Sequence, residues 1–300
     1  MEFLQRETYS KTGKPFPMQL ILNVSNYSSS TWYDKPIAKK RTKPGPKPAI
    51  DDAQALQLIK KDLKNTKFKG EGYLKVKKRL AKANKHIAKH RVNILMRDHD
   101  LLSPQRPVKN GRKRTHDGRI ITDKPDKMWG TDGKKFWAGK DGWCWFFSVI
   151  DHFNDEIISW HVAKTGNRFE ALTPVQRAVK CRFGSLDKAI CAGTSLQLRS
   201  DHGTQYESRD FLNEMKFLGL ELSKSFVRSP QCNGVIERFH RTLNEQVFDI
   251  NLFNSLEEAE KAVNIFVKDY NQEWMLHRFN CGSPVEAREK YYKSIEKKAA

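Results

Sequence analysis

The pattern of residues 128–248 limits the fold more than any other part of the sequence. It begins with three segments that are rich in aromatic and β-branched residues and separated by short turn sequences, at 128–138, 143–151 and 156–164. Helix-like and strand-like segments then alternate, at 168–182, 196–200, 207–218, 220–225 and 235–248. Three antiparallel strands followed by alternating helix and strand predict an α/β fold, with a mixed sheet and helices that flank it.

Residues 50–103, in contrast, are helical in pattern. Asp51 can cap a first helix, Gly70 and Gly72 precede a second, and a third buries its apolar residues and places Lys89 and Arg91 outside. Three short helices, the last of them basic, resemble a helix-turn-helix in which the third helix contacts DNA. A plain helical hairpin is the alternative.

Turn-rich, basic connectors flank these helices, and the first of them (38–49) is rich in Pro, Gly and Lys. We therefore expect a basic N-terminal segment and linker, a helix-turn-helix-like domain, a second basic linker, an α/β core and a C-terminal helical extension. The boundaries expected for these five parts are 1–49, 50–104, 105–127, 128–250 and 251–300.

The formal net charge of +20 is carried almost wholly by the first 131 residues. They hold 31 Lys and Arg against 12 Asp and Glu, a net of +19, whereas residues 132–300 hold 24 against 23, a net of +1. An excess confined to one region favours binding of a polyanion, most simply DNA or RNA, through the release of counterions. The alternative is a basic face that serves solubility, but solubility does not require this confinement.

Other features argue against several classes of protein. No apolar run approaches the ~18 residues of a membrane-spanning helix, and the start of the sequence lacks an apolar secretory signal. The five cysteines are scattered and form no Cys-x-x-Cys pair, so neither a disulfide framework nor a zinc ribbon is predicted. We expect a cytoplasmic protein with no membrane partner.

Three acidic residues stand where acids are unusual. Asp132 lies within an apolar strand, where an unpaired carboxylate is costly. Asp201 follows an apolar strand, at the edge where open α/β sheets place their ligands, and Glu237 lies on a helix just after a turn at 233–234. Taken singly, these residues have structural alternatives, namely a strand-edge acid, a turn residue and a helix-surface acid.

Taken together, the three acids predict a metal-dependent site. Converging carboxylates with no His or Cys cluster nearby suit the hard, oxygen-preferring ions Mg²⁺ and Mn²⁺. Two such ions about 4 Å apart can activate an attacking oxygen and stabilise a leaving one in phosphoryl transfer. The helix of Glu237 also carries Arg238, and it carries Arg241 one turn further on, so that a phosphate can be held beside the acid.

Four motifs carry a resemblance to a known family. The segments MWGTD, SVIDHF, LRSDHGTQY and CNGVIERFHRTLNEQ resemble the DDE core of the retroviral-integrase superfamily, in particular insertion-sequence transposases of the OrfB type. The likeness extends upstream through the helix-turn-helix-like region and downstream to a tail with the pair Tyr270 and Asn271, from about residue 20 to residue 292. It implies a ribonuclease-H-like fold, and cleavage and transfer of DNA strands with two Mg²⁺ (or Mn²⁺) ions in each active site.

The resemblance also implies roles for individual residues. Asp132, Asp201 and Glu237 correspond to the family's catalytic metal ligands, while Asp151, at the end of the second strand, has a structural role. The residues expected to contact DNA are Gln205, Tyr206, Asn233, Arg238, Arg241, Lys89 and Arg91. Asn244 departs from the family, because many relatives carry a lysine at that position.

The partners that the resemblance implies are nucleic acids and further protein chains. The DNA partners are the terminal inverted repeats of the element and the target DNA, on which a homo-oligomer is expected to assemble. A companion product of a smaller reading frame is an optional partner in this family. The alternative function is a catalytically inactive DNA-binding regulator or a transposase remnant, which needs only the basic N-terminal part. Retention of all three carboxylates favours the enzyme.

Overall fold

The computed structural model describes residues 7, 8, 10, 12–33, 49–104, 122–224 and 234–299. The chain divides into two compact units, Met1–Ala49 and Ile50–Ala300. Within the described part of the first unit, α1 (Met18–Val24) and α2 (Ser29–Tyr33) are short helices.

Three helices open the second unit, as the sequence predicts: α3 (Asp52–Asn65), α4 (Tyr73–Lys82) and α5 (Lys89–Asp98). Asp51 begins α3 with a capping box, because its side chain accepts from the Gln54 N–H while the Gln54 side chain accepts from the Asp51 N–H. The apolar faces of the three helices form a small core of their own, which includes Ile59, Val76 and Val92. Amphipathic spacing along each helix accounts for this packing.

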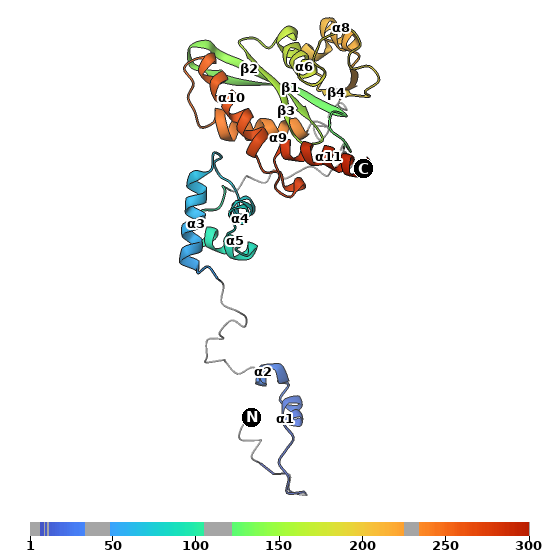
Figure 1. Ribbon diagram of the computed structural model, residues 1–300. Coiled ribbons are helices and arrows are strands. Elements are labelled where there is room, and N and C mark those ends of the chain that lie inside the picture. The colour runs from blue at the N-terminus through green and yellow to red at the C-terminus, as the bar shows by residue number, and fades with distance from the viewer. Residues whose placement is uncertain are drawn as a thin grey trace. The chain divides into compact units, whose positions relative to one another are not determined.

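The next part of the unit is a five-stranded mixed sheet (Figure 1), which confirms the predicted fold class. Its strands are β1 (Met128–Ala138), β2 (Gly142–Asp151), β3 (Ile157–Ala163), β4 (Gln197–Ser200) and β5 (Glu221–Lys224). The strand order is β3-β2-β1-β4-β5, with β1–β2 and β2–β3 antiparallel and with β1–β4 and β4–β5 parallel. The strand β1 therefore lies at the centre, where the antiparallel and parallel halves meet.

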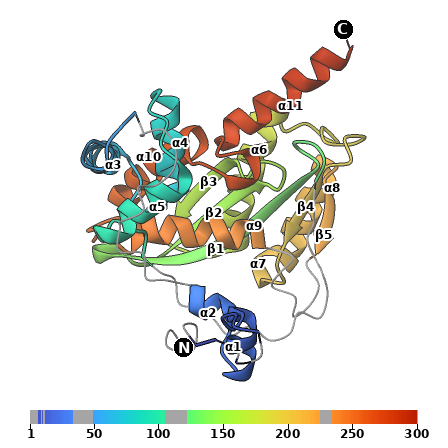
Figure 2. The ribbon, with the colours of Figure 1, turned by 90° about the horizontal axis from the view of Figure 1, so that it is seen from below.

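Helices cover both faces of the sheet (Figure 2). Buried residues of α6 (Arg168–Phe183), α7 (Thr204–Glu207) and α8 (Arg209–Leu218) join one face in a core that includes Trp129, Val149 and Leu198. The opposite face packs against α9 (Gly234–Leu243) and α10 (Leu256–Glu273), around Phe146 and Phe239. The alternation of side chains along β1 and β2 supplies both cores, since successive residues point to opposite faces. None of the described helices is long and apolar enough to cross a membrane.

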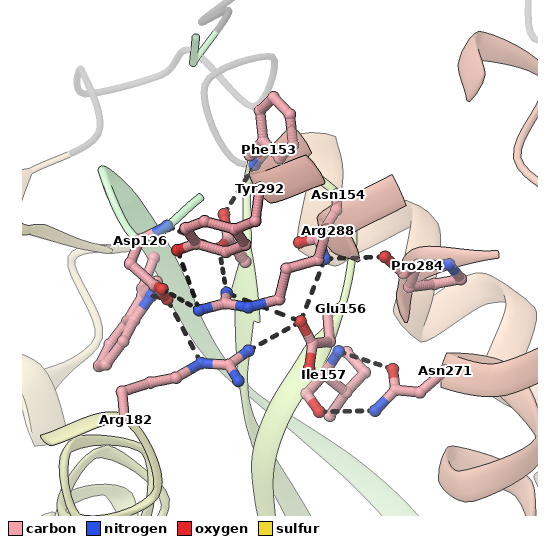
Figure 3. Close-up of polar contacts among 12 residues, drawn as sticks. Asp126, Phe153, Asn154, Glu156, Ile157, Arg182, Asn271, Pro284, Arg288 and Tyr292 are labelled. Carbon is pink, nitrogen blue, oxygen red and sulfur yellow. Dashed lines mark hydrogen bonds and ion pairs between the residues drawn. The ribbon is translucent and has the colours of Figure 1, made fainter. Parts of the chain in front are cut away.

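The C-terminal part contributes a further helix, α11 (Pro284–Ala299), after a short 3₁₀ turn, η4 (His277–Phe279). Buried charges join α11 to the turn that follows β2 (Figure 3). The guanidinium of Arg288 contacts Asp126 and lies 3.8 Å from Asp151 and 3.9 Å from Glu156, while Arg182 of α6 pairs with Glu156 at 2.7 Å. Segments far apart in the sequence are thus held together around the end of β2.

The three-helix region is anchored on the core by the loop between α3 and α4. Phe68 packs edge-on against Trp274, with ring centroids 4.9 Å apart, and belongs to the same core cluster as Phe266. The Lys75 ammonium lies 3.3 Å from the centre of the Trp274 ring, and Lys67 pairs with Asp269 at 2.7 Å. Residues Ile50–Ala300 therefore behave as one compact unit.

Candidate active site

The sheet register brings two of the predicted acids side by side. The parallel strands β1 and β4 pair Gly130 with Arg199, and Asp132 and Asp201 each follow two residues later. Neighbouring strands lie about 4.8 Å apart, so equal offsets from a registered pair leave the two acids adjacent at the strand ends. The short apolar strand β4 ends at Ser200, which frees Asp201 from the ladder at the carboxyl edge of the parallel half.

Backbone N–H groups orient both aspartates. The Gly133 N–H donates to Asp132 Oδ1 at 2.7 Å, and the Gly203 N–H donates to Asp201 Oδ1 at 2.9 Å. The glycine at 133 has a packing reason, since a Cβ there would come within 2.5 Å of the Phe147 ring. A larger residue at this position would displace the ring and disturb the strand next to Asp132.

Glu237 approaches the same place from α9. Burial raises the pKa of Asp201 and of Glu237, and the charge of Asp132 raises both pKa values further. For Glu237, the neighbouring charges of Arg241 and His240 act in the opposite direction. The charge of Asp132 acts on both of the other acids, so Asp132 lies near each of them.

In donor chemistry the three carboxylates fit a hard divalent cation, since their oxygens are the ligands that Mg²⁺ and Mn²⁺ prefer. Burial, and then the charge of Asp132, raises the pKa of Asp201 and of Glu237, and a positive ion would offset both effects. Across residues 49–104, 122–224 and 234–299, however, no three His, Cys, Asp or Glu side chains are gathered closely enough to hold an ion as they stand.

His240, which is not among the predicted site residues, lies inside the site. Its ring is 6% exposed, its Nδ1 is 3.5 Å from Asp132 Oδ2, and its Nε2 is 3.3 Å from Ser148 Oγ. The helical period indicates that His240 is buried, because His240 shares a face of α9 with the buried residues Ile236 and Leu243. His240 therefore links the central acid to the adjacent strand β2.

The residues predicted to contact DNA differ in their exposure to solvent. On α9, Arg238 and Arg241 are exposed residues, as is Glu237. Gln205 is half-buried, and its side-chain amide lies over Gly203. On α5, Lys89 is exposed. Arg91 is half-buried and pairs with Asp52 at 2.6 Å.

Tyr206 requires a correction, and Asn233 lies outside the described residues. The side chain of Tyr206 is only 2% exposed and packs edge-on against Phe211 at 5.2 Å. Burial raises the pKa of its hydroxyl well above the usual value. In the motif DHGTQY the aromatic residue is thus the first apolar contact of α7 with the core, and its ring is not available to DNA.

Asn244 marks a change in the helix of Glu237. α9 ends at Leu243, and residues Asn244–Phe248 form a π-helical turn in which the Asp249 N–H donates to the Asn244 carbonyl at 2.9 Å. The side chain of Asn244 is half-buried, and its Oδ1 has no hydrogen-bond partner among the described residues. Single π-turns inside helices are frequent at functional sites.

Two family models match the part of the chain that contains the three acids. Residues 122–230 match one family model described as an integrase core domain, and residues 218–274 match a second with the same description. The InsD protein of insertion element IS2E from Escherichia coli K12 is 28% identical over 188 residues, which cover 62% of this chain and 84% of that protein. The transposase InsD for insertion element IS2A/D/F/H/I/K from Escherichia coli is also 28% identical over 188 residues, but the match covers only 61% of its length.

Solved structures include distant likenesses. The catalytic core domain of the HTLV-2 integrase, in complex with magnesium, is 17% identical with a TM-score of 0.41, over 55% of this chain and 97% of that chain. A chain in the structure of the simian T-cell lymphotropic virus intasome in complex with the PP2A regulatory subunit B56 gamma is 17% identical with a TM-score of 0.46, over 69% of each chain.

The mixed sheet, its flanking helices and the acids at its centre define a ribonuclease-H-like core of the integrase type. Residues 122–274 thus match integrase core domains, and the chain is similar to transposases of insertion elements.

Proposed function

We propose that the protein is a transposase that cuts and joins DNA strands at the ends of an insertion sequence, with Asp132, Asp201 and Glu237 as its catalytic residues. The observation that carries the proposal is the equal offset of Asp132 and Asp201 from a registered pair of parallel strands, with Glu237 affected by the same central charge. The match to the integrase core domain spans the two aspartates, and the second match spans Glu237.

Divalent ions are the expected cofactor, two Mg²⁺ or Mn²⁺ per site, held by Asp132, Asp201 and Glu237. When bound, they supply the activation of an attacking oxygen and the stabilisation of a leaving one. The protein itself orients the carboxylates, through the N–H groups of Gly133 and Gly203. The attacking groups are water for cleavage and a DNA 3′-hydroxyl for strand transfer, with no covalent enzyme intermediate.

Positive side chains next to the acids are suited to holding the DNA backbone. Arg238 and Arg241 lie exposed on the same helix as Glu237, at positions from which their guanidinium groups can bind phosphates. Gln205, whose amide lies over Gly203, is a further proposed DNA contact. These contacts locate the scissile phosphate without reading the sequence.

Recognition of the element ends is assigned to the basic N-terminal part. The helix α5, with exposed Lys89, is the proposed recognition helix of a helix-turn-helix, and the terminal inverted repeats are its proposed ligand. Joining two ends to a target calls for more than one copy of the chain, with a smaller reading-frame product as an optional companion. Such DNA is found in the cytoplasm of a bacterium, where we expect the protein to act.

Substitution of Asp201 by Asn tests the mechanism. Asp201→Asn removes one negative charge and one metal-binding oxygen, so Mg²⁺-dependent cleavage of an element-end duplex should fall below detection while DNA affinity stays within about twofold. Asp249→Asn, the same change at an exposed aspartate, should leave cleavage unaltered. Full cleavage by Asp201→Asn would exclude the proposed mechanism.

Metal binding gives a second measurement. Mn²⁺ should raise the melting temperature of the unaltered protein and not that of Asp201→Asn, since a ligand stabilises the state to which it binds. A protein that binds DNA but gains no stability from Mn²⁺ and cleaves nothing would instead be an inactive regulator or a transposase remnant.

A further inference from the structure

Two tryptophans are exposed at the closed end of the β1–β2 hairpin, although their strands run through the core. Trp137 and Trp143 face each other as a cross-strand pair, with their rings edge-to-face at 5.6 Å between centroids. They are 55% and 62% exposed, respectively. Large aromatic side chains are normally among the most buried on average, so an exposed pair at one point of the surface calls for an explanation.

Hydrogen bonds hold the closed end of the hairpin in place, so Trp137 and Trp143 remain exposed. The Lys140 N–H donates to the Asn254 carbonyl at 2.9 Å, and Asp141 accepts from the Leu256 N–H at 2.8 Å. A Cβ at Gly139 would lie 2.9 Å from the Asn254 carbonyl oxygen, so glycine is required there for this close contact. The tryptophans are therefore presented on a rigid support and lose little freedom on binding.

The surface around the pair is basic. Lys135 lies across from Trp145 on the same face, with its ammonium 5.1 Å from the centre of that ring. Lys135 and Lys140 are exposed and have no ion pair within the described parts of the chain, whereas Lys164 pairs with Asp141 at 2.7 Å. Aromatic rings next to uncompensated lysines complement a polyanion that carries flat apolar groups.

We propose that Trp137 and Trp143 form a stacking site for unpaired bases of DNA. Bases have two flat faces and a phosphate backbone, which matches a ring pair flanked by lysines, and stacking on aromatic side chains tolerates any base sequence. Paired bases inside a duplex do not offer these faces. The ligand is thus a single-stranded tail or an opened end.

The same strand connects this site to the proposed active site. Trp137 lies five residues after Asp132 in β1, which corresponds to about 17 Å, or about five nucleotides of one strand at 3.4 Å each. Trp137 points to the opposite face of the sheet from Asp132, so a tail must pass around the hairpin. The proposal rests on the proposed function for the presence of DNA ends, but stacking itself requires neither metal nor cleavage.

A second copy of the chain is the competing occupant, and the charges disfavour it. A symmetric contact between two copies would bring Lys135 and Lys140 close to the same residues of the partner, which is repulsive. A ring pair is also a small fraction of the roughly 1,000 Å² that a specific protein interface buries.

The test compares two DNA molecules in the presence of EDTA, so that no cleavage occurs. One is a blunt duplex and the other is the same duplex with a six-nucleotide unpaired dT tail, each titrated with the full chain. The double variant Trp137→Ala/Trp143→Ala should bind the tailed duplex about tenfold more weakly and the blunt duplex within about twofold. Trp137→Phe/Trp143→Phe should restore most of the loss, and Phe217→Ala, at an exposed aromatic residue of α8, should change neither affinity.

Equal affinities of the alanine variant and the unaltered protein for the tailed duplex would overturn the proposal. A loss of the same size on the blunt duplex would overturn it as well, since stacking on unpaired bases predicts a difference. A fall in oligomeric state by light scattering, with unchanged DNA affinities, would identify the pair as a protein interface instead. A failure of the proposed function would be distinguished from these outcomes, because it would appear as a loss of Mg²⁺-dependent cleavage by the unaltered protein.

Discussion

Burial shifts the pKa values of two neighbouring residues, Asp151 and His152, in opposite directions. Asp151 is fully buried, with both carboxylate oxygens accepting backbone N–H groups, and burial raises its pKa to about 7 despite the nearby Arg288, with Asp126 adding to the rise. Burial lowers the pKa of His152 to about 4, and the charges of Arg199 and Arg278 lower it further. Folding therefore favours a neutral acid beside a neutral imidazole.

These shifts predict opposite effects of pH on stability. Between about pH 4 and pH 7 the folded protein holds a proton on Asp151 that the unfolded chain has lost, so this contribution to stability declines as pH rises. Between about pH 4 and pH 6.5 the unfolded chain holds a proton on His152 that the folded protein lacks, so this contribution increases as pH rises. In the unaltered protein the two contributions largely cancel.

Single substitutions should separate the pH-dependent contributions of Asp151 and His152 to stability. Relative to the unaltered protein, Asp151→Asn should gain stability as pH rises from 4 to 7, and His152→Gln should lose stability as pH rises from 4 to 6.5. Each difference has a slope of up to about 1.4 kcal/mol per pH unit, the value for one proton. Urea unfolding at four pH values measures both, and slopes of the same sign would contradict the assignment.

The residues of the proposed site show what a local sequence pattern can indicate and what it cannot. Asp132, Asp201 and Glu237 could be proposed because an acid in an apolar strand, at a strand end or beside a turn is locally unusual. His240 and Tyr206 could not be placed, because their environment is set by which neighbours the helices bury. Imidazole and phenol are compatible with either side of a helix, and only tertiary packing decides.

At the scale of elements, the attachment of α11 to the core depends on one arginine, Arg288. Arg288 is the only residue of this helix in ion-pair contact with Asp126, Asp151 and Glu156 within the described parts of the chain (Figure 3). Removal of one partner from a buried ionic cluster leaves charges without compensation. The contacts of Arg288 therefore attach α11 to the core and also stabilise the turn after β2.

Arg288→Ala should lower the free energy of unfolding by about 2–3 kcal/mol, somewhat less than a fully buried pair because part of the side chain is exposed. Lys293→Ala is the matched control on the same helix, since its pair with Glu289 is exposed and should contribute less than about 0.5 kcal/mol. Denaturant unfolding of both variants measures the difference. Similar losses in the two would show that the cluster has no special role.

Element positions were more predictable than element ends and contacts. The strands of the sheet and most helices follow from apolar periodicity, which tertiary packing reinforces. The helix predicted at 235–248 is continuous in pattern, yet the structure changes to a π-turn at Asn244, because hydrogen-bond spacing leaves no trace in hydrophobicity. The contact of Arg182 and Arg288 with one turn joins residues more than a hundred positions apart, which no local pattern reveals.

At the scale of the whole molecule, the net charge is divided unevenly between two regions of the chain. The part of the chain before residue 132 has a net charge of +19, and the remainder, which contains all three proposed catalytic acids, has a net of +1. Non-specific affinity and catalysis are thus assigned to different regions. If phosphates are neutralised mainly by the first region, the salt dependence of DNA binding should be set there.

Two variants with the same change in net charge test this division. The first replaces Arg112, Lys113, Arg114 and Arg119 by Ser, and the second replaces the exposed residues Lys290, Lys293, Lys297 and Lys298 of α11 by Ser. Each DNA phosphate that a variant no longer neutralises should reduce the slope of log K against log salt by about 0.9. The first variant should therefore show a slope shallower by up to about 3.6, and the second a slope close to that of the unaltered protein. Fluorescence anisotropy with a duplex from 50 to 200 mM salt measures both slopes. Equal reductions would mean that total charge governs binding, and that the basic region before residue 132 is not a distinct DNA-binding surface.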